Sequence, residues 1–140
     1  MTPRERNQAM AARIRSGDLA PYAEGGYVLR VLSTPGRVSG ECRSWPIAVV
    51  QLKGQRYICG PNRNRDWVRN LLSSGWCLVE GDSPERQSAV LTEDDNAAQA
   101  VATYLGQLRR PSSMWPFPAD APVSKVREHL GEIAVFRLAA

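Results

Sequence analysis

The sequence has few of the residues on which most enzymes rely for catalysis. Its only histidine is His129, and its three cysteines are widely separated. An odd number of distant cysteines fits neither a disulfide framework nor a zinc site, since both need close pairs. No serine or cysteine can be paired with His129 from the sequence, and we expect that histidine to be a surface or helix-end residue. If the protein is an enzyme, we therefore expect a bound cofactor to supply the reactive group, and we predict no metal site. The cysteines are Cys42, Cys59 and Cys77.

Lysine and long apolar runs are also scarce. Among the 18 basic residues only Lys53 and Lys125 are lysines, and the net charge is +4. Arginine suits phosphate and carboxylate groups, but there is no basic helix face or aromatic RNA-binding pattern, so we predict no nucleic-acid partner. No apolar run is long enough for a membrane span, and the N-terminus lacks the apolar region of a secretory signal. These absences predict a cytoplasmic protein with reduced cysteines.

The overall composition is that of one globular domain. The chain has 140 residues, 43% of them hydrophobic and 23% charged. We therefore predict a single domain over residues 1–140, in which residues 1–20 form a helix and a connector. Apolar periodicity and turn residues divide the rest into short strands and a few helices. Strands are predicted over residues 27–34, 44–52, 56–60, 76–81, 85–92 and 132–138, and helices over residues 3–16, 61–75, 92–110 and 123–131.

This order of elements predicts a mainly β protein with peripheral helices (α+β). Strands and helices do not alternate regularly, and no glycine fingerprint follows the first strand, so a small antiparallel barrel fits better than a doubly wound sheet. Thr92 is expected to cap the third helix, whose acidic first turn complements the helix dipole. The segment 111–122 has four prolines and two aromatic residues, which indicates a rigid loop.

Two segments are candidates for ligand binding. The first is "TPGRVSGECRSWPI", residues 34–47, where glycines allow a close backbone approach and Arg37, Ser39 and Arg43 offer donors to phosphate oxygens. The alternative is a merely polar hairpin loop. The second is "GPNRNRDWVRNL", residues 60–71, which passes from a strand end into a helix N-terminus, a natural anion site. Trp67 could line a planar ring there or could be a core residue.

Together the two segments resemble the deazaflavin-dependent nitroreductases. The first matches the T-x-G-R-x-S-G-x-x-R-x-x-P-L/I signature of that family, and "DWVRNLLSSG" is similar to the W-V-x-N-L-x-x-x-G helix of one of its branches. The resemblance covers residues 27–78, with a weaker likeness in the final "AVFRL". It implies a six-stranded split β-barrel that binds coenzyme F-420 and transfers a hydride from the reduced deazaflavin to a small quinone, enone or nitro compound.

The resemblance also implies roles for individual residues. Arg37, Ser39, Gly40 and Arg43 would surround the cofactor phosphate. Many relatives have a second basic residue where this sequence has Val38, and Arg63 and Arg65 are the candidates to replace it. A proton donor cannot be assigned, because Tyr27 and Tyr104 lie far from the matched pattern. The residues expected to face the deazaflavin ring are Cys59, Gly60, Pro61, Trp67 and Asn70, and those expected on the substrate side are Trp115 and Phe117.

Two other functions remain open at this point. Related barrels bind flavin, haem or deazaflavin without catalysis, and the missing proton donor favours such a carrier. The other alternative is an FMN-dependent reductase on the same barrel. In each case the partner is a small molecule, and the protein is expected to be a monomer or a homodimer.

Overall fold

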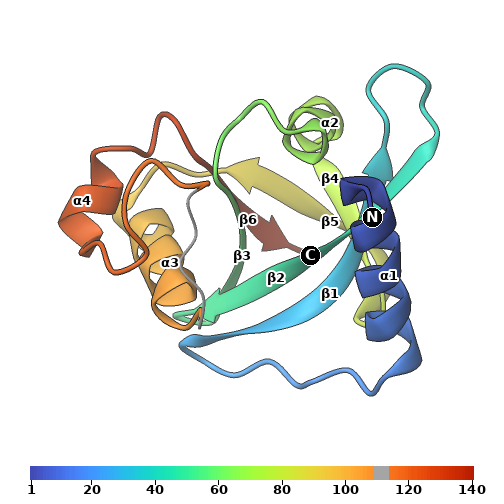
Figure 1. Cartoon of the computed structure of the whole chain (residues 1–140), viewed down its shortest axis with the longest axis horizontal. Coiled ribbons are helices and arrows are strands. Elements are labelled where there is room, and N and C mark those ends of the chain that lie inside the picture. The colour runs from blue at the N-terminus through green and yellow to red at the C-terminus, as the bar shows by residue number, and fades with distance from the viewer. Residues whose placement is uncertain (109–113) are drawn as a thin grey trace.

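The computed structural model describes residues 1–108 and 114–140, which form one β-barrel with helices around it (Figure 1). The predicted mainly β, α+β fold with six strands is confirmed. The strands are β1 (Gly26–Pro35), β2 (Cys42–Leu52), β3 (Gln55–Gly60), β4 (Trp76–Val79), β5 (Ser83–Leu91) and β6 (Ala134–Ala139). The helices are α1 (Pro3–Ser16), α2 (Asp66–Ser74), α3 (Asp95–Gly106) and α4 (Val123–Arg127).

The six strands close into an antiparallel barrel in the order β1-β2-β3-β6-β5-β4. The ladder between β1 and β2 is the longest, from Gly26 opposite Gln51 to Pro35 opposite Cys42. By contrast, β1 meets β4 only around Leu32 and Ser33. The far part of the β1–β2 pair therefore extends beyond the barrel as a two-stranded ribbon (Figure 1).

Alternation along the strands creates two apolar clusters on opposite faces of the sheet. The cluster inside the barrel is closed by α2 and includes Leu32, Ile58 and Phe136, all fully buried. The outer cluster lies under α3 and α4, where Val101 and Val126 pack on the outward side of β2, β3 and β6. The sheet is thus covered on the outside as well as filled within.

Helix α1 lies against the outer side of β1 and β2 at the opposite flank from α3 (Figure 1). Pro3 occupies its first turn, Thr2 caps it, and Gly17 ends it. Its last turn is joined to the β4–β5 turn by Arg15, whose Nη2 lies 2.7 Å from a carboxylate oxygen of Glu80. Within the described residues, none of the helices has the length and apolar character needed to cross a membrane.

Several predicted boundaries were wrong. Helix α2 begins at Asp66, because residues 61–65 form an irregular loop stabilised by an Asn62 side-chain hydrogen bond. Helix α3 is capped by Asp94, which accepts from the Ala97 amide, and Thr92 instead bonds back to the Val90 carbonyl. Helix α4 ends at Arg127. The predicted end of the third helix at Arg109 and Arg110, and residues 111–113 of the predicted loop, lie outside the described residues; residues 114–122 contain no helix.

Candidate functional site

The loop at the tip of the β1–β2 ribbon, residues 36–41, is fixed to α2. The Arg37 amide donates to Asn70 Oδ1 at 3.1 Å, and Arg37 Nη1 donates to the same oxygen at 2.8 Å. A weaker ion pair joins Arg37 Nη2 to Asp66 at 3.3 Å. Thus the two segments singled out in the sequence, far apart along the chain, are in direct contact. We call the residues 36–43 and 65–70 the junction.

The loop itself is shaped by its two glycines. Gly40 has φ +76°, a left-handed conformation that L side chains rarely adopt, and its amide donates to the Gly36 carbonyl at 2.9 Å. A Cβ on Gly36 would lie 3.3 Å from Arg43 Nε, so Gly36 lets the Arg43 side chain lie close to the loop backbone. Ser39 accepts from the Glu41 amide. The sequence therefore forms a tight turn that brings the backbone and Arg43 together.

Positive charge is concentrated at the junction. Arg43 is exposed and has only a distant carboxylate partner, Glu41 at 4.0 Å. Arg65 occupies the N-cap position of α2, and it provides no side-chain cap to the first amides of that helix. The guanidinium of Arg65 contacts Met114 Sδ at 3.0 Å, while its buried Nε has no hydrogen-bond partner within the described residues. An uncapped helix start beside unpaired guanidiniums is a favourable environment for an anion.

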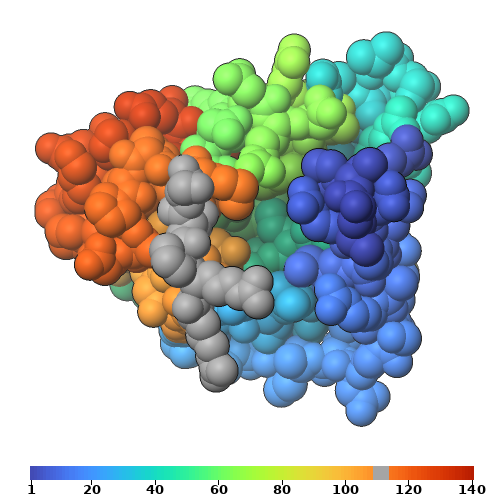
Figure 2. Space-filling model, viewed as in Figure 1, coloured from blue at the N-terminus to red at the C-terminus, as the bar shows by residue number. Residues whose placement is uncertain are grey.

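Figure 2 shows that the surface is hollowed below α2, between α1 and the segment around residues 114–118, with β1 and β2 at the floor. We call this hollow the outer groove. Between the end of α1 and the first half of β1 lies a cavity of about 320 Å³, whose lining includes the apolar Ile14 and Leu29 and the charged Arg13 and Asp18. Leu29 is 42% exposed, which is unusual for a large apolar side chain in a central position on a strand. The groove therefore offers an apolar floor next to the charged junction.

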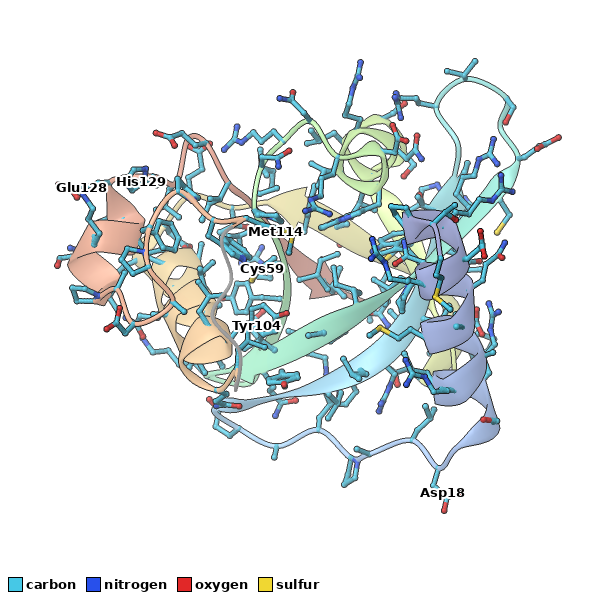
Figure 3. The ribbon with its side chains drawn as sticks, viewed as in Figure 1. Asp18, Cys59, Tyr104, Met114, Glu128 and His129 are labelled. Carbon is cyan, nitrogen blue, oxygen red and sulfur yellow. The ribbon has the colours of Figure 1, made fainter. Side chains whose placement is uncertain are left out.

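Neutral polar groups line the α3 side of the same sheet face (Figure 3). Cys59 belongs to the outer cluster, and burial raises the pKa of its thiol to about 12. Tyr104 of α3 packs on that cluster and meets the Tyr27 ring edge-on, with centroids 5.2 Å apart. Burial also raises the pKa of Tyr104. Both Cys59 and Tyr104 therefore keep their protons at neutral pH, so the thiol is not an activated nucleophile.

Trp67 and Gly60 have a packing role in the structure. The Trp67 ring stacks on Trp45 with centroids 5.4 Å apart and contacts Phe136 at 6.1 Å. A Cβ on Gly60 would lie 2.8 Å from the Trp67 ring, so the strand end needs glycine to admit that ring. One face of Trp67 is thus covered by Trp45, and only its partly exposed remainder is available to a ligand. Pro61, next along the strand end, is half-buried.

Other predicted site residues are engaged away from the junction. Arg63 donates to the backbone carbonyls of Ile133 and Leu130, each at 2.8 Å, and pairs with Glu93, so it fastens the start of α3 to the segment after α4. Trp115 and Phe117 are buried in the outer cluster with ring centroids 5.9 Å apart. Only the edge of Trp115, 9% exposed, can reach a ligand.

His129 lies in the middle of the turn that follows α4. Its backbone carbonyl accepts from the Glu132 and Ile133 amides, its Nδ1 lies 3.2 Å from Glu132, and its ring packs on Phe117. Within residues 1–108 and 114–140, the structure contains no group of three or more histidine, cysteine or acidic residues placed to hold a metal ion.

Sequence reasoning missed the grouping of Tyr27, Tyr104 and Cys59. These residues come from β1, α3 and β3, and no spacing in the sequence indicates that they meet. The only available signal was the apolar face of α3, on which Tyr104 falls together with Val101 and Leu105.

Fold and site together define a closed six-stranded antiparallel β-barrel with peripheral helices and an arginine-rich junction above an apolar groove. No family model matches this chain, and no curated protein matches it.

Proposed function

We propose that this protein is an F-420-dependent oxidoreductase that reduces a small, fairly apolar quinone, enone or nitro compound. The observation that carries the proposal is the contact of Arg37 with Asn70, which joins the two segments resembling the deazaflavin-dependent nitroreductases into one junction. This junction lies beside the outer groove, so an anionic tail and a planar ring of one ligand would find suitable surfaces next to each other.

The residues at the junction fit the phosphate and polyglutamate tail of this cofactor. Arg43 is exposed, Arg65 has no acidic partner within the described residues, and the loop backbone around Gly40 is open, since a Cβ there would meet nothing within 4 Å. In this scheme Arg43, Ser39 and Arg65 bind the anion. Arg37 and Asn70 act mainly by holding the loop in position, because the Arg37 guanidinium is occupied by Asn70 and Asp66.

The groove fits a planar apolar group. When bound, the reduced deazaflavin supplies a hydride in a single two-electron step. The apolar surface around Leu29 orients the acceptor and excludes water, and the acceptor also needs one proton. Tyr104 Oη is the best-placed group to hold that proton, because it is half-buried on this face of the sheet and remains protonated. Cys59 stays a neutral packing residue.

A non-catalytic carrier of deazaflavin, flavin or haem is the second candidate. It is favoured by the protonated state of Cys59 and Tyr104, since burial raises the pKa of both side chains. A carrier would bind its ligand at the junction and groove without changing the rate at which the reduced cofactor is oxidised.

A side-by-side titration with F-420, FMN and haem tests the proposal. We expect F-420 to bind in the micromolar range or tighter, about −8 kcal/mol, with quenching of tryptophan fluorescence. Tight FMN binding without F-420 binding would contradict it and support the FMN-dependent alternative. Adding a quinone to the complex with reduced F-420 then separates enzyme from carrier, because only an enzyme accelerates loss of the reduced-cofactor absorbance.

Tyr104→Phe is expected to lower kcat more than tenfold with unchanged F-420 affinity.

A further inference from the structure

A cavity lined by residues of several strands lies at the other end of the barrel, where β2 ends and β3 begins. Its volume is about 600 Å³, within the range of small-molecule sites. The junction lies at the opposite end, where β1 ends and β2 begins. The cavity is therefore separate from the surface proposed above to bind F-420. We call it the barrel-end cavity.

Inward-facing polar residues from four strands line this cavity. Each lies two positions from a residue of the interior cluster and so points to the same face of its strand. A barrel interior is normally filled by apolar side chains, and here the apolar filling stops one layer short of the end. These residues are Arg30 of β1, Gln51 of β2, Arg56 of β3 and Gln87 of β5.

Part of this polar layer is already satisfied by protein groups. Arg30 is buried, and its guanidinium donates to Asp82 at 3.0 Å and to the carbonyls of Leu29 and Ala20. Asp82 also accepts from the Tyr22 hydroxyl at 2.5 Å. Arg30 and Asp82 thus neutralise each other and form a fixed wall of the cavity.

The remaining groups are less fully bonded, and the one side-chain hydrogen bond between them in the described residues is long, from Arg56 Nε to Gln51 Oε1 at 3.4 Å. Arg56 lies over the Tyr22 ring, 3.6 Å from its centroid, and is 3.8 Å from Asp82, so its charge is only partly compensated. Gln87 is 8% exposed, and its side-chain amide makes no hydrogen bond within the described residues but keeps access to the cavity. Such an amide is free to bind water or a ligand. Arg86 adds a further positive charge to the lining, with its guanidinium 3.8 Å from the centroid of the Trp76 ring.

We propose that the barrel-end cavity is a second binding site, for a small organic molecule that carries a carboxylate or a phosphate. Arg56 presents the fixed fork of donors that suits either oxyanion, and its ring contact with Tyr22 holds that fork in place. Gln87 supplies a donor and an acceptor from the opposite side of the barrel interior. The lining arginines outnumber the lining acids, and one acid, Asp82, is already paired with Arg30.

Nuclear magnetic resonance titration of the full chain tests this inference with two probes, inorganic phosphate and succinate, at constant ionic strength. We expect at least one probe to shift the Gln87 side-chain amide and the Arg56 Nε–H resonances saturably, with a millimolar dissociation constant. The probe that binds more tightly identifies the oxyanion. Shifts confined to residues 36–43, or no saturable shift by either probe up to about 20 mM, would overturn the proposal.

Two variants and a control locate the site. Gln87→Leu and Arg56→Gln should each weaken probe binding at least tenfold, about 1.4 kcal/mol. Gln87→Leu should keep or raise the melting temperature, because the Gln87 amide makes no hydrogen bond within the described residues and leucine adds apolar surface to the barrel interior, and so it separates loss of binding from loss of folding. Arg137→Gln is the matched control, since Arg137 is an exposed arginine on the outer side of β6, and it should bind like the parent. Parent-like binding by both cavity variants would contradict the assignment.

Discussion

Asn70 Oδ1 accepts two hydrogen bonds from Arg37, one from the backbone amide at 3.1 Å and one from the guanidinium at 2.8 Å. Because Asn70 is buried on α2, this single oxygen fixes the position of the whole loop at the tip of the β1–β2 ribbon. The side chain suggested by the sequence as a contact for the deazaflavin ring thus has a structural task first, which is to hold the loop of residues 36–41 in place.

Asn70→Ala should release that loop. It leaves the Arg37 amide without its acceptor, so we expect a loss of about 1–3 kcal/mol in the free energy of unfolding, together with weaker F-420 binding. Urea unfolding and cofactor titration on the same variant measure the two effects. Asn64→Ala, at an exposed position with no side-chain hydrogen bond in the described residues, is the control and should change neither quantity. An unchanged unfolding midpoint for Asn70→Ala would show that the contact does not order the loop.

Arg43→Ala tests the anion site without disturbing the fold. Arg43 is exposed and only distantly paired, so its removal should leave the melting temperature unchanged. If the guanidinium binds phosphate, F-420 affinity should fall by about 1.5–3 kcal/mol, and Arg43→Lys should restore only part of it. Added salt should weaken binding by the parent and affect Arg43→Ala less. Parent-like affinity of the alanine variant would remove the phosphate role.

Gly60→Ala should destabilise the protein through Trp67. The added methyl would lie 2.8 Å from the indole ring, and that ring is held between Trp45 and Phe136. We expect a cost of about 1–3 kcal/mol, the usual scale for an overpacked core. Gly106→Ala provides the contrast, because a Cβ there meets nothing within 4 Å at the end of α3 and alanine favours helix; it should be neutral or slightly stabilising. Equal melting temperatures for the two variants would contradict the proposed contact.

Tyr22→Phe should change how stability depends on alkaline pH. Burial, and then the hydrogen bond to Asp82, raise the pKa of Tyr22 above its ordinary value of 10.0. The folded protein therefore keeps this hydroxyl neutral where the unfolded chain ionises, so its stabilising contribution is complete below pH 10 and is lost as the pH rises further. Tyr22→Phe should cost about 1–2 kcal/mol at pH 7, and the difference from the parent should shrink at pH 11. Chemical unfolding of both proteins at pH 7 and pH 11 measures this difference in the free energy of unfolding. A difference that stays the same at both pH values would contradict the prediction.

The strands were predictable because their signal is local. Alternating apolar residues and turn glycines mark all six strands within a few residues of their observed ends, and Gly81 with φ +86° forms the turn between β4 and β5. The short connections between the predicted strands also favoured an antiparallel barrel. Helix boundaries failed where local signals competed, since Thr92 and Asp94 are both good caps and only tertiary packing on the sheet selects Asp94.

The sites were less predictable because they depend on contacts between distant residues. The sequence placed Arg37 and Trp67 in two separate motifs. It could not show that Asn70 binds Arg37 or that the Trp45 ring covers one face of Trp67. On α2 the apolar Leu72 is exposed and the polar Asn70 is buried, which hydrophobicity alone does not predict. The polar layer of the barrel-end cavity was invisible, since Arg30 and Gln87 look like ordinary solvent-facing strand residues until the barrel closes around them.

The position of β6 has a consequence for how the chain folds. This strand is the last in sequence, yet it lies between β3 and β5 and pairs with both, so that Arg56 faces Leu138 and Leu91 faces Phe136. During synthesis, β1 to β5 can pair only as an open sheet, joined through the short contact of β1 with β4, and their interior apolar residues stay exposed to solvent until residues 134–139 emerge from the ribosome. Closure then depends on pairing of β6 with β3, a strand far away in the sequence. Such pairing is slow compared with hairpin formation and leaves a late window in which the nascent protein is open to aggregation.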